Sequence, residues 1–269
     1  MSKEENLDLF KKFTLYLEKK FGWFVIPSKI ENTAFILGKL IMKHGESGVL
    51  EVFSSPVNHD YYSAVDEDVI DLYSVSETYF NREPEVFERL NQLTDSVLST
   101  RNSVKILCAA SSSGEEVYST SISLKNNFFN NEVSIYGAEI NEKLINLAKA
   151  GVYTEWSLRA CSHDYRTGYF DPDGKKFKLK EEYMKNVYFR KYNLLSQNID
   201  YYFNGIRFDI ILCRNIFLYL NPNAIERVVE NLLSLLNPGG YIITGLAEGA
   251  ISERLKSNSY NGFRNIFKF

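Results

Sequence analysis

The sequence predicts an α/β protein, in which a doubly wound sheet follows a small helical domain. After Arg101, short apolar runs alternate with helix-like stretches, a pattern typical of a mostly parallel sheet covered on both faces. Before Leu98, apolar residues recur at helical spacing between breakers such as Gly45 and Gly48, which indicates short helices. We therefore expect a helical domain over 1–72, a linker and connecting helix over 73–100, and a ligand-binding α/β domain over 101–269.

The individual elements follow in chain order. Apolar residues at helical spacing are Phe10, Phe13, Leu15, Leu17 and Phe21, and again Ile36, Leu37, Leu40 and Ile41. Pro84 suits the first turn of a helix over Glu85–Leu98, because the N–H that proline lacks would be unpaired there. Strands are expected at Val104–Ala110, Val133–Ile140, Val187–Tyr192, Phe208–Cys213, Tyr241–Leu246 and Phe263–Phe269. Further helices are expected at Glu115–Phe128, Glu142–Ala150 and Asn223–Leu236, the last closed by Asn237-Pro238-Gly239-Gly240.

Composition excludes several classes. With 31 basic and 34 acidic residues the net charge is −3, which counts against a protein that holds nucleic acid through phosphates. No apolar run approaches the ~20 residues that span a bilayer, and the mixed-charge start does not resemble a secretory signal. Three cysteines and three histidines lack metal-ligand spacing, so we expect no metal site. A cytoplasmic protein without direct membrane insertion is the expectation.

The loop after the first expected strand carries the first candidate site. Its small residues, 109–114, let a backbone approach a ligand, but its single glycine does not make a dinucleotide-binding fingerprint. Glu115 follows this loop, and Glu139 ends the next strand 24 residues later, where related folds bind ribose hydroxyls through a carboxylate. Two acids suit the cationic, phosphate-free S-adenosylmethionine better than NAD. The alternative is a capped helix start and a solvated acid at a strand end.

Three longer segments resemble one family. Residues 76–83 (SETYFNRE) resemble the N-x-T-x-F-F-R-E signature of CheR-type chemotaxis receptor methyltransferases. Residues 112–119 (SSGEEVYS) resemble their S-T-G-E-E-P-Y-S, and residues 208–220 (FDIILCRNIFLYL) their F-D-x-I-F-C-R-N-V-x-I-Y-F. Shorter blocks at 193–195 and 238–240 follow in the same order. The resemblance covers nearly the whole chain.

The resemblance implies a Rossmann-like methyltransferase sheet and an S-adenosylmethionine-dependent glutamate O-methyltransferase, which releases S-adenosylhomocysteine. By this resemblance the cofactor-binding residues are Ser76, Thr78, Arg82, Glu115, Glu139, Asn193, Leu194, Arg214 and Asn215. Arg82 and Tyr219 are the implied catalytic residues. The chain departs from the family pattern at Ser76, Asn81, Val117 and Glu139, where the family has asparagine, phenylalanine, proline and aspartate.

Chemistry supports the assignment of Arg82 independently, because a guanidinium can pair with the carboxylate of the cofactor or of the acceptor glutamate. Its alternative is a surface arginine at a helix start. Arg214 and Asn215 follow a buried-looking strand and are expected at the ligand crevice, unless they only end that strand. Tyr219 is either part of the methyl-transfer channel or a core aromatic residue.

The implied partner is the cytoplasmic domain of methyl-accepting chemotaxis receptors, with its glutamate-bearing helices, bound by a monomer. Residues 1–43 hold eight lysines and five acids; Lys11, Lys12, Lys19 and Lys20 recur on a helical pattern that could meet an acidic helix, or are simply solvated. Some family members grip a receptor pentapeptide on an antiparallel insert. The matching β-subdomain, about 169–193, has Gly174 as its only glycine, so we expect pentapeptide-independent methylation.

Two alternatives to this function remain open. A methyltransferase of another substrate class, acting on nucleic-acid amines, would carry an Asn/Asp-Pro-Pro-aromatic block where Cys213-Arg214-Asn215-Ile216 stands. A non-catalytic signalling module that binds S-adenosylmethionine or S-adenosylhomocysteine is the other alternative, based on Ser76 and Asn81.

Overall fold

The structure, a computed structural model, describes residues 3–128 and 132–269. The first two residues of the expected helical domain therefore lie outside the described part. The chain divides into two compact units. The helical unit comprises Met1–Val75 with Asn193–Asn198 and Ile216–Asn231, and the α/β unit comprises Ser76–Tyr192, Ile199–Asn215 and Leu232–Phe269. The helical unit is thus built from three chain segments, whereas the sequence predicts one continuous domain over 1–72.

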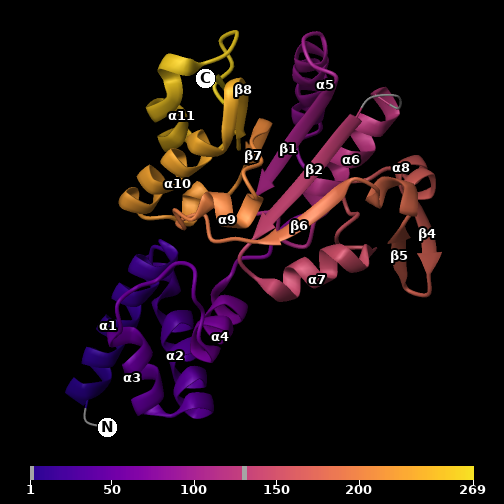
Figure 1. Ribbon diagram of the computed structural model, residues 1–269. Coiled ribbons are helices and arrows are strands. Elements are labelled where there is room, and N and C mark those ends of the chain that lie inside the picture. The colour runs from indigo at the N-terminus through magenta and orange to yellow at the C-terminus, as the bar shows by residue number, and fades with distance from the viewer. Residues whose placement is uncertain (1–2, 129–131) are drawn as a thin grey trace. The chain divides into compact units, whose positions relative to one another are not determined.

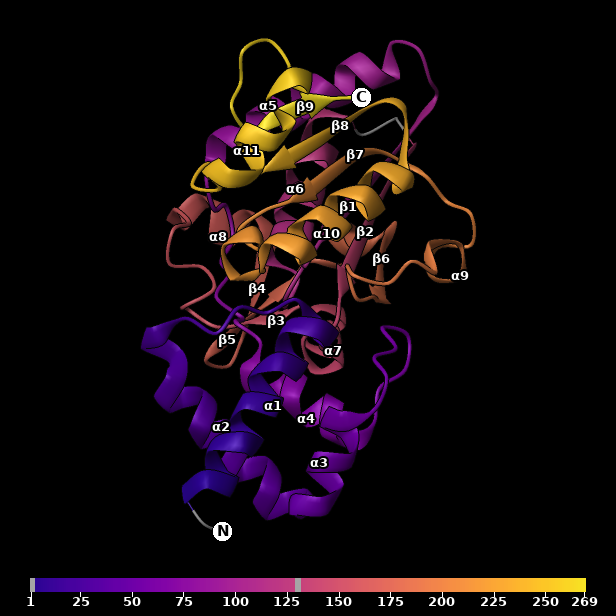
Figure 2. The same cartoon turned by 90° about the vertical axis from the view of Figure 1, so that its left-hand side faces the viewer.

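The helical unit is organised around aromatic packing. Its main helices, which group together in Figures 1 and 2, are α1 (Lys3–Phe21), α2 (Ile30–His44), α3 (Glu46–Ser54) and α4 (Ala64–Tyr73). Phe13 and Tyr16 of α1 contact the ring of Phe53 on α3, with centroids 4.9 and 4.8 Å away. Such apolar contacts stabilise a helix that is too short to persist alone. Two short 3₁₀ turns, η1 (Pro27–Lys29) and η3 (Phe217–Tyr219), belong to the same unit.

Lys20 differs from the expectation of a basic solvated face. Its side chain is buried, with the residue 4% exposed. The ammonium donates to the carbonyls of Asn58 and Tyr61, the latter at 2.6 Å, and lies 4.0 Å from the carboxylate of Asp66. Burial lowers the pKa of Lys20 to about 8. Lys20 therefore ties the segment before α4 to α1, and the exposed face of α1 retains Lys11, Lys12 and Lys19.

The α/β unit contains a six-stranded sheet in the order β6-β2-β1-β7-β8-β9, parallel except for β9. Its strands are β1 (Ser103–Ala109), β2 (Glu132–Glu139), β6 (Val187–Lys191), β7 (Phe208–Cys213), β8 (Leu236–Thr244) and β9 (Ile266–Lys268). This is the expected doubly wound, Rossmann-like arrangement, in which β1 and β7 are buried on both faces. No helix within the described residues is long and apolar enough to cross a membrane.

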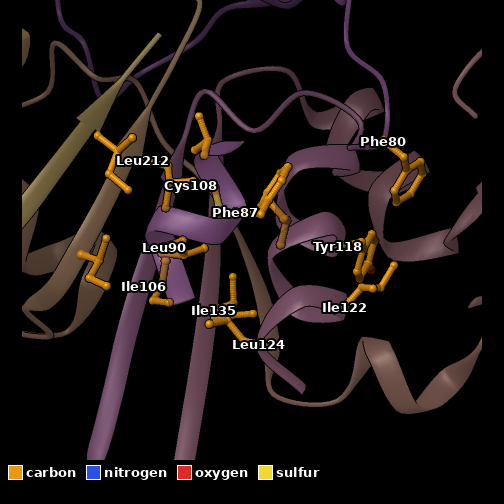
Figure 3. Close-up of a cluster of buried hydrophobic side chains, with 14 of the residues drawn as sticks. Phe80, Phe87, Leu90, Ile106, Cys108, Tyr118, Ile122, Leu124, Ile135 and Leu212 are labelled. Carbon is orange, nitrogen blue, oxygen red and sulfur yellow. The ribbon is translucent and has the colours of Figure 1, made fainter. Parts of the chain in front are cut away.

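The α/β unit contains the helices α5 (Pro84–Leu98), α6 (Glu115–Asn127), α7 (Glu142–Ala150), α8 (His163–Tyr169), α9 (Ile199–Phe203), α11 (Gly249–Leu255) and the 3₁₀ turns η2 (Glu181–Met184) and η4 (Lys256–Asn258). Of these, α5, α6 and α7 pack on strands of the main sheet. Helix α10 (Pro222–Leu235) contributes its residues up to Asn231 to the helical unit and the rest to the α/β unit. In Figure 3, Phe87 of α5 and Tyr118 of α6 belong to one buried cluster with Ile106 and Cys108 of β1. Pro84 stands in the first turn of α5, as expected.

Two elements differ from their predicted form. The segment Asn237-Pro238-Gly239-Gly240 does not close α10 but lies inside β8, because Leu236 already pairs with Phe208 and the register shifts before Tyr241 pairs with Ile210. The antiparallel insert has the order β3-β5-β4. Its strands β4 (Phe170–Asp173) and β5 (Lys176–Leu179), seen beside α8 in Figure 1, lie within 169–193, but β3 (Val152–Tyr153) does not. Strand β6, also within 169–193, joins the main sheet.

Candidate functional site

The candidate site lies at the carboxyl edge of the parallel sheet. Ala109, the last residue of β1, is in register with Ala138 of β2 and with Cys213, the last residue of β7. Cys213 in turn pairs with Thr244 at the end of β8. The loops that follow these strands therefore start at one level, where doubly wound sheets bind their ligands.

The loop between β1 and α6 is held in an uncommon backbone conformation. Ala110 and Ser112 have φ of 58° and 49°, in the left-handed region that non-glycine residues rarely adopt. Gly114 has φ of 91°, and a Cβ there would lie 2.8 Å from the Cβ of Ala148. Only glycine fits at position 114, because both the torsion and the space exclude a side chain. The loop is fixed on the sheet by the N–H of Ser111, which donates to the carbonyl of Ala138 at 2.9 Å.

Glu139 closes the second strand and faces this loop. One carboxylate oxygen accepts the N–H of Ser112 at 2.9 Å, and the other accepts those of Ile140 and Asn141 at 2.9 and 3.0 Å. Burial raises the pKa of Glu139, although these three N–H donors favour the charged form. A carboxylate offers about four lone-pair directions, so Glu139 retains one acceptor position for a ligand hydroxyl.

Glu115 begins α6 and is 2% exposed. Its carboxylate accepts the hydroxyl proton of Ser113 at 2.7 Å and a hydrogen bond from the Ser157 side chain. Burial raises the pKa of Glu115, and these hydrogen bonds together with the charge of Arg159 oppose the shift. Glu115 thus places a buried carboxylate next to the loop, where it suits a cationic ligand group.

The segment 76–83 lies against the same loop. The hydroxyl of Ser112 donates to the carbonyl of Ser76 at 3.5 Å, the N–H of Phe80 donates to the carbonyl of Ser157 at 2.9 Å, and the N–H of Asn81 donates to the hydroxyl of Ser119 at 3.0 Å. Thr78, between these anchors, is half-buried.

Arg82, the last residue but one of this segment, keeps most of its donors available. Among the described residues its one hydrogen bond is a long contact of 3.4 Å to the carbonyl of Glu77, and its guanidinium lies 5.5 Å from the centre of the Tyr79 ring. Asn81 and Glu83, on either side, have φ of 58° and 59°. Strained backbone on both sides of a half-buried guanidinium is typical of a functional site.

Arg214 follows β7 and lies in a buried ion-pair cluster, with its side chain 1% exposed. It donates to Glu116 at 2.6 Å, to Glu83 at 2.9 Å and to the carbonyl of Arg82 at 3.0 Å. Burial favours the neutral form, but the carboxylates of Glu116 and Glu83 outweigh it and raise the pKa of Arg214. The cluster therefore fixes the turn that carries Arg82. Asn215, the next residue, has φ of 60°.

The structure thus brings seven predicted site residues into the α/β unit. They are Ser76, Thr78, Arg82, Glu115, Glu139, Arg214 and Asn215. Asn193, Leu194 and Tyr219 belong to the helical unit. There the side chain of Asn193 donates to the carbonyl of Lys20 at 3.2 Å, and the carbonyl of Leu194 accepts from Asn231 at 2.7 Å. The carbonyl of Tyr219 accepts the N–H of Phe24 at 2.9 Å.

Sequence reasoning missed several residues that shape this site. Glu83 and Glu116 lie in the quoted motifs, but nothing local indicates that both pair with Arg214, which is 131 and 98 residues away. Ser157 connects Phe80 with Glu115, and the pattern around it contains no signal beyond a short polar stretch.

Comparison with known proteins identifies the family. Residues 76–264 match the family described as CheR methyltransferase, SAM binding domain. The chain belongs to the CheR family. A chemotaxis protein methyltransferase of Borreliella burgdorferi is 31% identical to this CheR chain over 192 residues, or 67% of each chain. Chemotaxis protein methyltransferase 1 of Vibrio cholerae is 29% identical over 250 residues, which is 89% of this chain and 88% of its own. Cher2 of Pseudomonas putida is 28% identical over 254 residues, or 90% of each chain.

The CheR chain is thus an S-adenosylmethionine-dependent methyltransferase, and its site suits that cofactor. Buried carboxylates at Glu115 and Glu139 match a cationic ligand with ribose hydroxyls. Within the described residues, the buried Ser111 hydroxyl under the first loop and the buried Thr244 hydroxyl at the end of β8 have no hydrogen-bond partner. A buried polar atom without a partner is uncommon, and these two lie where β1 and β8 end, at the ligand-binding edge of the sheet.

Proposed function

We propose that this CheR protein transfers a methyl group from S-adenosylmethionine to glutamate carboxylates on the cytoplasmic helices of chemotaxis receptors, acting as a monomer in the cytoplasm. The observation that carries the proposal is the presence in one unit of an available guanidinium, Arg82, and of a strained loop, 110–114, beside the buried carboxylates of Glu115 and Glu139. Arg82 supplies the charge that an acceptor carboxylate needs, and Glu115 and Glu139 beside the loop supply the carboxylates that a sulfonium cofactor needs.

When bound, the cofactor would supply an electrophilic methyl group on a positively charged sulfur; the S–C bond would break as a glutamate oxygen forms the C–O bond, and the sulfur would leave as a neutral thioether. The acceptor glutamate is already ionised at neutral pH, because its reference pKa is ~4.3. No general base is therefore required. The chain's own contribution is alignment of the two groups and exclusion of water from the carboxylate.

We further propose roles for the individual residues. Glu139 and the backbone of loop 110–114 hold the ribose, and Glu115 faces the amino-acid part of the cofactor. Ser76 and Thr78 contact the cofactor next to them. Arg82 orients a carboxylate. Arg214 and Asn215 contribute through their backbone, because both terminal nitrogens of the Arg214 guanidinium already donate to Glu83 and Glu116, and its buried Nε has no hydrogen-bond partner among the described residues. For Asn193, Leu194 and Tyr219 the proposed roles are those that the family resemblance implies, cofactor binding for the first two and catalysis for Tyr219.

The proposal is tested by incubating the protein with methyl-tritiated S-adenosylmethionine and a receptor cytoplasmic fragment. A glutamyl methyl ester is labile to base, so the expected result is receptor-bound label that alkali releases as volatile methanol. A receptor fragment with its methylation-region glutamates replaced by alanine is the matched control and should remain unlabelled. Label that withstands alkali would indicate another substrate class. Binding of S-adenosylhomocysteine in a calorimeter, without any transfer, would indicate a non-catalytic signalling module.

A further inference from the structure

Four side chains of the α/β unit form a row of alternating rings and guanidinium groups. The guanidinium of Arg159 lies 4.2 Å from the ring centre of Trp156 and 4.1 Å from that of Tyr79. The Tyr79 ring also contacts Arg82, whose guanidinium lies 5.5 Å from the ring centre. Each contact is within the range of a cation–π interaction. We call Trp156, Arg159, Tyr79 and Arg82 the cation–π row.

The exposed end of the row is held in place. Arg159 donates to the carbonyl of Trp156 at 2.7 Å and forms an ion pair with Glu77. The turn that carries Trp156 is closed by the N–H of Ser157, which donates to the carbonyl of Thr154 at 3.1 Å. A side chain positioned in this way loses little conformational freedom when a partner binds to it.

The row begins at the candidate site. Ser157, the neighbour of Trp156, accepts the N–H of Phe80 with its carbonyl at 2.9 Å and hydrogen-bonds Glu115 with its side chain. Tyr79 precedes Phe80 directly, and Arg82 follows two residues later. The row therefore runs from the residues proposed to contact cofactor and acceptor to the protein surface.

Trp156 is 63% exposed, although tryptophan is among the most apolar surfaces a protein can bury. The Trp156 ring does not pack in the core, and the buried residue of this turn is instead Leu158. Tryptophan, tyrosine and arginine are also the residues most enriched among binding hot spots. A rigid, exposed tryptophan at the rim of a site is thus better explained by a partner than by stability.

We propose that the cation–π row is the surface on which the acceptor helix docks. The inference rests on the proposed function and adds the location of acceptor recognition. An apolar side chain of the acidic receptor helix covers Trp156, and the acceptor glutamate of that helix reaches Arg82, whose donors are largely available. The charges along the row favour an acidic helix as the partner. Arg82 at the inner end attracts carboxylates, whereas the charge of Arg159 is neutralised by Glu77.

The test compares Trp156→Ala, Trp156→Phe and Tyr201→Ala in initial-rate assays with a receptor cytoplasmic fragment. Tyr201 is the matched control, since it is an exposed aromatic residue of the same unit, 73% exposed and outside the row. For Trp156→Ala we expect the KM for receptor to rise about 10- to 30-fold, as loss of a hot-spot ring does. We expect kcat, thermal stability and the Kd for S-adenosylhomocysteine to stay within about twofold. Trp156→Phe should recover most of the affinity, and Tyr201→Ala should match the wild type.

A second readout uses fluorescence. The chain has two tryptophans, and the receptor-induced change in emission should persist in Trp23→Phe and disappear in Trp156→Phe. If Trp156→Ala has an unchanged KM for the receptor while the wild-type enzyme is active, only this inference is overturned and the proposed function stands. Loss of S-adenosylhomocysteine affinity by the same factor as receptor affinity would assign Trp156 to the cofactor and also overturn it. Absence of transfer by the wild-type protein would instead overturn the proposed function, and the inference with it.

Discussion

Arg214 and Glu116 are joined by a 2.6 Å ion pair inside the α/β unit, and the arginine side chain is almost fully buried. The same guanidinium reaches Glu83 and the carbonyl of Arg82. This arrangement connects the end of β7, the start of α6 and the turn before α5. The motif predicts that Arg214 contacts the cofactor, but its side chain is bound to other groups of the protein.

Replacing Arg214 tests how much its ion pairs contribute to stability. Arg214→Met should destabilise the protein by about 3–5 kcal/mol, because the partly buried carboxylates of Glu83 and Glu116 would lose the buried cation that pairs with both. Urea denaturation measures the change. Arg207→Met is the control, since Arg207 pairs with the exposed Asp200 and should cost less than about 1 kcal/mol. Equal, small losses for both variants would show that the buried cluster is not a determinant of stability.

Glu139 should govern cofactor affinity. Glu139→Ala removes the carboxylate that accepts the N–H of Ser112, and we expect S-adenosylhomocysteine binding to weaken by about 1–3 kcal/mol. Isothermal calorimetry provides the measurement. Glu142→Ala, at an exposed acid of the following helix start, should bind like the wild type. An unaltered Kd for Glu139→Ala would remove Glu139 from the site.

The affinity for S-adenosylhomocysteine should also depend on pH. Burial raises the pKa of Glu139, so this carboxyl gains a proton at a higher pH than the ~4.3 of an ordinary glutamate. The charged carboxylate accepts hydrogen bonds through both oxygens and more strongly than the protonated form does, and binding should therefore weaken as the pH falls through the raised pKa. Glu139→Gln should bind weakly with a flatter profile. Parallel pH profiles for the two proteins would assign the titration to another group.

Arg82→Ala should reduce turnover far more than it reduces stability. The side chain is half-buried and makes only one long hydrogen bond among the described residues, so its loss removes little native packing. A loss of kcat by more than about 100-fold is expected if it orients the acceptor carboxylate, with the melting temperature nearly unchanged. A melting temperature well below that of the wild type, with activity lost in proportion, would make Arg82 a structural residue.

Methylation should not require a receptor C-terminal pentapeptide. Peptide addition needs an exposed strand edge, and the small sheet offers two poor ones. Strand β3 has two residues, and β4 contains Pro172, which has no N–H to donate. Initial rates on a receptor with and without its tail should agree within about twofold. A large drop without the tail, or measurable binding of the free pentapeptide, would contradict this expectation.

The strands and the first loop of the α/β unit could be predicted because their signals are local. Buried parallel strands are continuous apolar runs, and Pro84 marks a helix start by its own covalent structure. The local pattern of the β8 segment predicts a turn, but pairing of Leu236 with Phe208 overrides the turn preference of Pro-Gly-Gly. Strand β3 is too short to show a period.

Polar interactions were predicted less well, because they depend on residues distant in sequence. A lysine on a helix, such as Lys20, carries no local sign of the carbonyls of Asn58 and Tyr61 that hold it. The same limit applies to Arg214. Motif similarity located these residues near the site, but the number of partners that each side chain already has is visible only in the folded chain.

The three-segment composition of the helical unit has a consequence for biosynthesis. The carbonyl of Lys20 is paired by the side chain of Asn193, 173 residues later, and that of Gly22 by the N–H of Asn221. A chain emerging from the ribosome exposes α1–α4 long before these partners exist. The helices α1–α4 are therefore synthesised well before the two later segments that complete their unit, and this unit cannot be completed until residues up to Asn231 have been made.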